Sequence, residues 1–265
     1  MEQEINKIVT WIEKEVKAAN AKGVVIGISG GIDSAVVAAL AKKAFPQNAL
    51  GLWIGIESSR SARRNALRVF QNLELEAISL NLKPTLDEFV KDIFALEIIA
   101  DGDIVAFEKK INGEKLPRET SYLELPNYNE IIGNIKARLR TAVLYAWAQR
   151  NNYLVLNTSN LLEIYVGYYT KWGDGVGDLA PIAHLNKTQI YKMANLLNIP
   201  EMVISSTPIA DLWSDQKTDE EEMGISYSNI ENYLADKELD EGKRVLIENL
   251  HEKNKHKLIG LKKVK

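Results

Sequence analysis

A polar loop near the N-terminus combines the residue types that bind phosphate. It reads Ile28-Ser29-Gly30-Gly31-Ile32-Asp33-Ser34 and lies between an apolar run and helix-like sequence. Adjacent glycines let the backbone approach an anion closely, and the free N–H groups and dipole at a helix start favour negative charge. The two serines add hydroxyl donors. A carboxylate beside phosphates is repulsive unless a cation bridges them, so Asp33 indicates Mg²⁺.

The same loop has a simpler interpretation. Gly30-Gly31 could form an ordinary turn, with Asp33 or Ser34 as the N-cap of the following helix. The string fits neither the Walker A pattern nor the dinucleotide fingerprint. A lone Gly-Gly pair would favour the turn, whereas the whole string favours a phosphate site.

Strand-like and helix-like segments alternate along the chain. Candidate strands occupy residues 24–28, 49–56, 75–82 and 153–156, and the apolar run at 24–28 is typical of a buried parallel strand. Helical periodicity marks residues 2–20, 33–44, 60–73, 85–99, 131–149, 187–197, 225–234 and 241–254. The alternation predicts an α/β fold, a doubly wound parallel sheet of about five strands flanked by helices, in a single domain of residues 1–265.

Ligands in such folds lie at the carboxyl ends of the strands. Two polar loops follow strand ends here, residues 29–34 and 158–163. Residues 100–130 are punctuated by Gly, Pro and Asn and are interpreted as a long loop. Residues 251–265 are basic, and a solvated tail is one interpretation of the lysines in this segment.

Composition excludes several function classes. The 265 residues include no cysteine, which rules out a cysteine nucleophile, thiolate metal ligands and disulfides in this chain. A net charge of −3 provides no basic field for nonspecific nucleic-acid binding. No apolar run approaches the roughly 18–20 residues of a membrane span, and the N-terminus lacks a signal-peptide pattern. We therefore expect a cytoplasmic protein without nucleic-acid or membrane partners.

The phosphate loop resembles the SGGxDS loop of the ATP pyrophosphatase superfamily, which holds pyrophosphate and implies an adenine nucleotide alpha hydrolase-like fold. The second half of the chain is similar to the NAD synthetase family in motif order and spacing, so the resemblance runs from Gly27 to about Lys257. The segments that carry it are residues 133–140, 157–163, 166–175, 178–182, 185–189, 210–213 and 223–227.

The resemblance implies an activity. The family adenylates deamido-NAD with ATP, releasing pyrophosphate, and ammonia then attacks the adenylate to give NAD and AMP. It also implies Mg²⁺ as cofactor and a homodimer whose contact includes the helix of residues 131–149. Some relatives carry a glutaminase domain with a cysteine nucleophile; this cysteine-free chain should lack one and should use ammonia.

Site residues follow from the resemblance, position by position. Asp33 and Glu163 should bind Mg²⁺ and, with Lys187, should be catalytic. ATP should be bound by Gly27, Ile28, Ser29, Gly30, Gly31, Ile32, Asp33, Ser34, Thr158, Lys187 and Ile209. Deamido-NAD should be bound by Arg138, Lys171, Asp178, His256 and Lys257.

The chain departs from the family pattern in three places. Ile209 stands where relatives often carry Ser or Thr, so only a backbone contact with ATP is expected there. The loop of residues 57–64 is basic and lacks the expected Met-Pro and acidic residues, and the segment of residues 100–130 is longer than usual. These departures affect contacts with adenine, not the phosphate chemistry.

Two other functions remain open at this stage. A different ATP pyrophosphatase, such as a tRNA-modifying enzyme, would need a basic RNA-binding surface. A nucleotide sensor without catalysis would not need charged site residues, yet Asp33, Glu163, Lys171 and Lys187 are all present.

Overall fold

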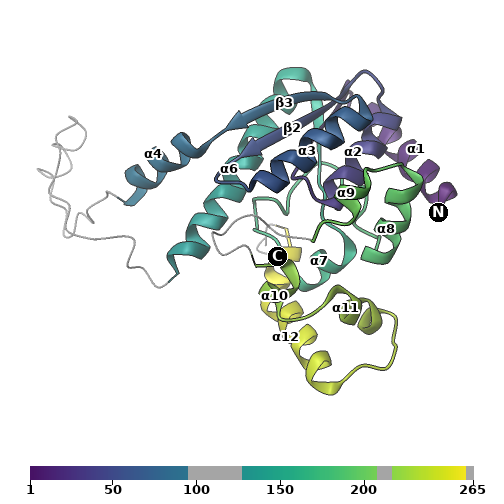
Figure 1. The fold of residues 1–265 in the computed structure, drawn as a ribbon, viewed down its shortest axis with the longest axis vertical. Helices are drawn as coiled ribbons and strands as arrows, with labels where there is room; N and C mark the ends of the chain where they lie inside the picture. Colours follow the sequence, from purple (N-terminus) through teal and green to yellow (C-terminus); the bar gives the residue numbers. More distant parts are fainter. Residues whose placement is uncertain (95–126, 208–216, 261–265) are drawn as a thin grey trace, which may run out of the picture.

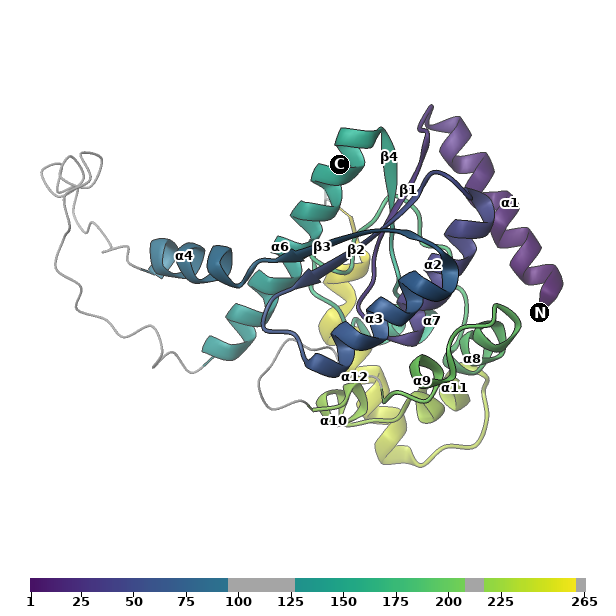
Figure 2. The same ribbon diagram turned by 45° about the horizontal axis from the view of Figure 1, so that its top comes forward.

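The computed structural model describes residues 1–94, 127–207 and 217–260 of the chain. Figures 1 and 2 show a central sheet with helices on both faces. A group of short helices, together with α12, lies beyond one end of the sheet. Within the described ranges, no helix is both long enough and apolar enough to cross a membrane.

Four parallel strands make up the sheet of the described residues, in the order β3-β2-β1-β4. The strands are β1 (Gly23–Gly27), β2 (Ala49–Gly55), β3 (Glu76–Asn81) and β4 (Tyr153–Leu156). From β1 the chain adds β2 and then β3 on one side of the sheet, and it adds β4 on the other side, so the strand order reverses at β1 and the sheet is doubly wound. This confirms the predicted fold class.

The expected count of about five strands is too high for the described part of the chain. Beyond β4 there is a single parallel bridge, between Leu156 and Leu179. The Asp178 carboxylate accepts a hydrogen bond from the Val155 N–H at 2.7 Å, which occupies a donor on the outer edge of β4. Pro181, which has no N–H, follows soon after. A fifth strand therefore stops after one pairing.

Helices occupy the described part of every segment in which helical periodicity was found. The long helices are α1 (Glu2–Ala18), α2 (Ile32–Ala44), α3 (Arg60–Leu73), α4 (Lys83–Phe94), α6 (Tyr128–Asn151), α8 (Lys187–Leu196), α11 (Tyr227–Leu234) and α12 (Glu241–Leu258). Three helices of four to six residues were not predicted: α7 (Leu161–Val166), α9 (Glu201–Ile204) and α10 (Asp219–Met223). They are too short to show a helical period.

Two sequence interpretations change at segment ends. The helix predicted over residues 241–254 continues to Leu258 as α12, so residues 255–258 are helical and not part of a solvated tail. The predicted loop of residues 100–130 lies outside the described residues except for 127–130, which cap and begin α6. The end of the predicted helix 85–99, beyond Phe94, also lies outside them.

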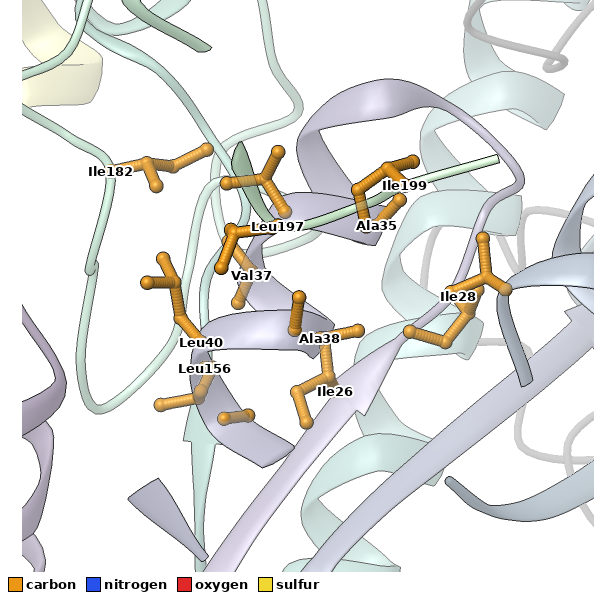
Figure 3. Close-up of a cluster of buried hydrophobic side chains, with 14 of the residues drawn as sticks. Ile26, Ile28, Ala35, Val37, Ala38, Leu40, Leu156, Ile182, Leu197 and Ile199 are labelled. Atoms are coloured by element: carbon orange, nitrogen blue, oxygen red, sulfur yellow. The ribbon is translucent and has the colours of Figure 1, made fainter. Parts of the chain in front are cut away.

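The alternating side chains of β1 build two cores. Val24 and Ile26 pack with α1, α2 and α8 on one face, whereas Val25 packs with α6 residues on the other. Figure 3 shows Ile26 of β1, Leu156 of β4 and Leu40 of α2 within the larger of these clusters. Helix α2 is buried over most of its length because it lies between the sheet and the outer helices. The phosphate loop is thus anchored at both ends in the core.

A third apolar cluster lies apart from the sheet and joins α7 to α11 and α12. Its buried members are Leu162, Val166, Met223, Ile225, Tyr227, Ile230 and Ile247. Figure 1 shows α7, α10, α11 and α12 gathered together below the sheet. The cluster holds a second layer of helices against the end of the sheet where the loops after β1 and β4 lie.

Burial in the α2 core can be tested with one substitution type at two sites. Leu40 is fully buried and Leu67 of α3 is 48% exposed. Leu40→Ala should lower the free energy of unfolding by about 2–5 kcal/mol, because it removes buried methyl groups and leaves a cavity. Leu67→Ala is the matched control and should change it by less than about 0.5 kcal/mol. Urea unfolding measures both, and equal losses would contradict the described core.

Candidate active site

A cleft of about 500 Å³ opens at the carboxyl ends of β1, β2 and β4. The phosphate loop forms one wall, and Ser58, Ser59 and Ser61 add hydroxyl groups from the loop after β2 and the start of α3. Residues 157–159 line it after β4, together with Glu163 of α7. Ligands of doubly wound sheets bind at this position.

The phosphate loop is held open by its own serines. Ser34 Oγ lies 3.0 Å from Ser29 Oγ and donates to the Gly31 carbonyl at 2.9 Å, while the Gly31 N–H donates to Ser29 Oγ at 3.2 Å. The N-cap of α2 is Gly31, and no side chain caps the helix, so neither Asp33 nor Ser34 is the N-cap. The start of α2 is therefore built like an anion site.

Gly30 meets a requirement that no other residue could meet here. Its φ is +92°, in the region that favours glycine, and a Cβ would lie 2.3 Å from the Ala62 carbonyl oxygen. The loop thus lies directly against the first turn of α3, and this contact sets the width of the cleft at that point.

Three residues predicted to be catalytic meet beside the loop. Lys187 Nζ lies 2.7 Å from Asp33 Oδ2 and 3.7 Å from Glu163 Oε1. Asn160 Nδ2 donates to the other oxygen of Asp33 at 3.2 Å. The three groups come from the first turns of α2, α7 and α8, far apart in sequence.

Helix capping places two of these side chains. Asn160 is the N-cap of α7 and forms a capping box with Glu163, whose Oε2 accepts from the Asn160 N–H at 3.1 Å. Asn186 caps α8 in the same way with Gln189, which leaves Lys187 at the first helical position. A lysine there opposes the helix dipole. The nearby carboxylates compensate for that cost.

Two tyrosines and two further carboxylates lie behind Glu163. The Tyr227 hydroxyl lies 2.9 Å from Asp219 Oδ2 and 3.2 Å from Glu163 Oε1. The Tyr168 hydroxyl donates to Glu222 Oε2 at 2.5 Å and lies 3.3 Å from Asp219 Oδ1. We call Asp33, Glu163, Asp219, Glu222 and Lys187 the charged cluster. Asp33 and Glu163 lie against the Lys187 ammonium, and Asp219 and Glu222 join them through the hydroxyl groups of Tyr227 and Tyr168.

The charged cluster perturbs the protonation of its members. Burial, with the neighbouring Asp33 carboxylate, raises the pKa of Glu163 to about 8. Burial also raises the pKa of Asp219. Burial disfavours the Lys187 ammonium, but Asp33 and Glu163 outweigh that effect and raise the pKa of Lys187. Lys187 is therefore a fixed positive charge, and the cluster as a whole favours additional cations.

The residues predicted to bind deamido-NAD lie beside the cleft, not in its lining. Arg138 Nη2 donates to the Lys171 carbonyl at 3.2 Å, and Lys171 Nζ donates to the His256 carbonyl at 2.5 Å. Lys257 Nζ donates to two backbone carbonyls of residues 167–169. Asp178 is at the edge of β4 and next to a shallow hollow on α6. Their role in substrate binding stays a prediction.

The other predicted residues are those expected to bind ATP and Mg²⁺. Thr158 and residues 27–34 line the cleft. Ile209 lies outside the described residues, so its predicted ATP contact is not addressed. Within those residues, no three His, Cys, Asp or Glu side chains are placed to hold a metal ion together, so a metal would rest on Asp33 and Glu163 with other oxygen donors.

The structure adds cleft residues that sequence reasoning missed. Arg140 lines the cleft and donates from Nε to the Ile54 carbonyl at 3.2 Å. Asp174, Tyr168 and Asp219 line it as well. Arg140 and Asp174 lie within motifs that were recognised, so their positions could have been flagged. Asp219 had no signal, because an acidic helix start usually serves only the helix dipole.

Comparison with known proteins identifies relatives along nearly the whole chain. The family model described as NAD synthase matches residues 4–260. The NH(3)-dependent NAD(+) synthetase of Mesoplasma florum is 40% identical over 260 residues, 98% of this chain and 95% of the relative. The protein of the same name from Mycoplasma pneumoniae is 37% identical over 254 residues, 96% of this chain and 91% of its own.

Solved structures are similar to this chain over nearly its whole length. The structure of NMN synthetase from Francisella tularensis matches with a TM-score of 0.81 and 30% identity, over 99% of this chain and 98% of that one. The NH3-dependent NAD synthetase from Campylobacter jejuni matches with a TM-score of 0.74 and 28% identity, over 100% and 99% of the two chains. On the family match and the identity to curated relatives, this chain belongs to the NAD synthase family.

Proposed function

We propose that this chain is a ligase that makes NAD from deamido-NAD, ATP and ammonia, with adenylation of the substrate carboxylate at the described cleft. One observation carries the proposal: the glycine-rich loop, Asp33 and Glu163 line one cleft at the carboxyl end of the sheet, and the buried Lys187 ammonium lies against both carboxyl groups. The curated relatives named NH(3)-dependent NAD(+) synthetase support the nitrogen source.

The chemistry has two steps with one leaving group each. A carboxylate oxygen of deamido-NAD attacks the α-phosphorus of ATP, the bond to the bridging oxygen breaks, and pyrophosphate leaves. Ammonia then attacks the acyl carbon, loses a proton, and AMP leaves with the electron pair of the C–O bond. AMP is a far better leaving group than the oxygen of a free carboxylate. The glycine-rich loop would hold the pyrophosphate end through backbone N–H groups.

Lys187 would act as a fixed positive charge in the first step. Its ammonium is buried and lies at the boundary between the phosphate loop and α7. Positive charge that is already in place stabilises negative charge developing on phosphate oxygens without reorganisation. Asp33 accepts a hydrogen bond from the Lys187 ammonium, and Asn160 donates a hydrogen bond that holds Asp33 in place. Lys187 therefore cannot turn toward solvent.

The donor set fits Mg²⁺. Asp33 and Glu163 offer carboxylate oxygens on one side of the cleft, the ligand type that Mg²⁺ prefers alongside substrate phosphates and water. The excess of carboxyl groups in the charged cluster also favours a divalent cation. When bound, Mg²⁺ would neutralise phosphate charge during adenylation.

The proposal includes a cytoplasmic homodimer. Helix α6 exposes a shallow hollow of about 510 Å³ lined in part by Ala142, Ala146 and Tyr145. Small side chains allow close approach of a second helix, and Asp178, a predicted substrate residue, lies at the same hollow. A dimer formed through α6 would bring that residue to the boundary between the subunits.

A direct assay tests the function. The chain with ATP, Mg²⁺, deamido-NAD and ammonium should form NAD and AMP in equal amounts, with no reaction when either deamido-NAD or ammonium is omitted. The chain is also similar to an NMN synthetase, with a TM-score of 0.81, so the same assay should be run for NMN synthesis. Nicotinate mononucleotide should replace deamido-NAD only poorly. A preference for the mononucleotide would assign the chain to NMN synthesis instead.

The role of Asp33 is tested by Asp33→Asn. The change preserves volume but removes one carboxylate from both Lys187 and the proposed Mg²⁺ site. Pyrophosphate release dependent on deamido-NAD should fall by about a hundredfold or more. Asp92→Asn, at an exposed position on α4, is the matched control and should retain activity. Near-normal Mg²⁺-dependent activity in Asp33→Asn would refute the assignment.

The raised pKa of Glu163 predicts a pH-dependent stability. Burial and the Asp33 carboxylate raise this pKa from 4.5 to about 8, so between these values the folded chain binds more protons than the unfolded chain. Stability of the metal-free protein should therefore fall as pH rises through that window, by up to about 1.4 kcal/mol per pH unit.

Glu163→Gln should remove that part of the slope, as measured by urea unfolding at several pH values without Mg²⁺. Glu238→Gln, at an exposed position, is the matched control and should keep the slope of the unmodified chain. A slope that is the same in Glu163→Gln and in the unmodified chain would show that Glu163 titrates normally.

A further inference from the structure

The carbonyl groups at the end of α7 have an unusual set of donors. A helix leaves its last carbonyls without helical partners. Two of them are satisfied by the chain itself, because the Tyr168 N–H donates to the Glu163 carbonyl at 2.9 Å and the Gly167 N–H donates to the Ile164 carbonyl at 3.2 Å. The carbonyls of residues 165–167 accept hydrogen bonds from side chains of α12 instead.

Three side chains of α12 supply these bonds. His251 Nδ1 donates to the Tyr165 carbonyl at 2.8 Å, and Asn254 Nδ2 donates to the Val166 carbonyl at 2.9 Å. Lys257 Nζ donates to the Gly167 carbonyl at 2.6 Å. Residues three apart lie on one face of a helix, so the three donors form a row. We call His251, Asn254 and Lys257 the capping row.

The match between the capping row and α7 depends on close contact. Gly167 has φ +69°, and a Cβ on it would lie 2.3 Å from Asn254 Cβ. The His251 ring stacks on Tyr165 with 4.4 Å between centroids and 20° between planes. Successive donors meet successive carbonyls, so a shift of α12 by one residue would break all three bonds. The capping row thus fixes the register of α12 against α7.

Helix α7 needs such support. It has six residues, fewer than the roughly 12–15 below which an isolated helix is marginal. Apolar contacts of Leu162 and Val166 hold it against α11 and α12 but are not directional. At its other end the helix carries Asn160, bonded to Asp33, and Glu163, the proposed Mg²⁺ ligand.

We infer that the capping row positions Glu163 for catalysis through α7, and that His251 and Asn254 are positioning residues of the reaction. The inference rests on the proposed function of Glu163 as an Mg²⁺ ligand. Neither side chain lines the cleft, so their effect passes through α7 alone. Lys257 belongs to the same row, and the predicted substrate role of that residue is separate.

Asn254→Asp is the sharpest test. It keeps the shape of the side chain but faces the Val166 carbonyl with a carboxylate oxygen, so a bond becomes a repulsion. Amide hydrogen exchange in residues 160–169 should accelerate, while exchange in the sheet stays unchanged. The Mg²⁺ concentration for half-maximal activity should rise about tenfold, and kcat should fall more than KM for ATP changes.

Three further variants complete the design. His251→Ala removes a donor and should show the same pattern more weakly, and His251→Gln, which keeps an N–H donor, should restore part of the loss. Lys253→Ala, exposed on α12, is the matched control and should match the unmodified chain in every measurement. His251→Ala serves as the test if Asn254→Asp does not fold.

The result that would overturn the inference is unchanged exchange in residues 160–169 together with an unchanged Mg²⁺ midpoint. A loss of activity explained by the unfolded fraction alone, with the Mg²⁺ midpoint unchanged, would also overturn it. Hydrogen exchange needs no turnover. Failure of the unmodified chain to make NAD would therefore count against the proposed function, whereas the exchange data would still decide whether the capping row holds α7.

Discussion

The buried ion pair between Lys187 and Asp33 is the interaction on which the site depends. Lys187 keeps only 4% of its surface exposed, and a charge taken out of water at such a place is costly unless it is paired. Its partner distances are 2.7 Å to Asp33 and 3.7 Å to Glu163. The pair therefore ties the starts of α2, α7 and α8 together at the end of the sheet. Loss of Lys187 would leave Asp33 and Glu163 without their shared positive charge, and loss of Asp33 would remove the nearest counter-charge of Lys187.

The same pair leaves the cleft with a charge imbalance that suits its proposed chemistry. The charged cluster contains four carboxyl groups and one lysine, and burial together with the Asp33 charge raises the pKa of Glu163 to about 8. A divalent cation relieves this imbalance. ATP and deamido-NAD are both anionic, so on the proposed function the same cation would also offset their mutual repulsion. Metal and nucleotide binding would then be mutually favourable.

Sequence reasoning predicted the features that depend on local pattern. The strand–loop–helix unit around Asp33 is local, the eight long helices produced helical periodicity, and the four strands were visible as short candidate segments between the helices. The rotation of a helix about its own axis cannot be predicted from a local pattern. Arg138 and Arg140 share one motif, but only Arg140 lines the cleft, because the packing of α6 on the sheet decides which face of the helix points toward the cleft. Asp219 and Tyr227 join the site through tertiary contacts across more than one helix. The five-strand estimate was wrong for the described residues because the Asp178 carboxylate occupies the edge of β4.

The most direct test of the account is isotope exchange between pyrophosphate and ATP in the absence of ammonia. If the cleft adenylates deamido-NAD, the enzyme should transfer label from pyrophosphate into ATP only when both deamido-NAD and Mg²⁺ are present. Added ammonium should then convert the bound adenylate to NAD and AMP. Exchange that proceeds equally well without deamido-NAD, or release of ADP and phosphate in place of pyrophosphate, would contradict the proposal that this site activates a carboxylate by adenylation.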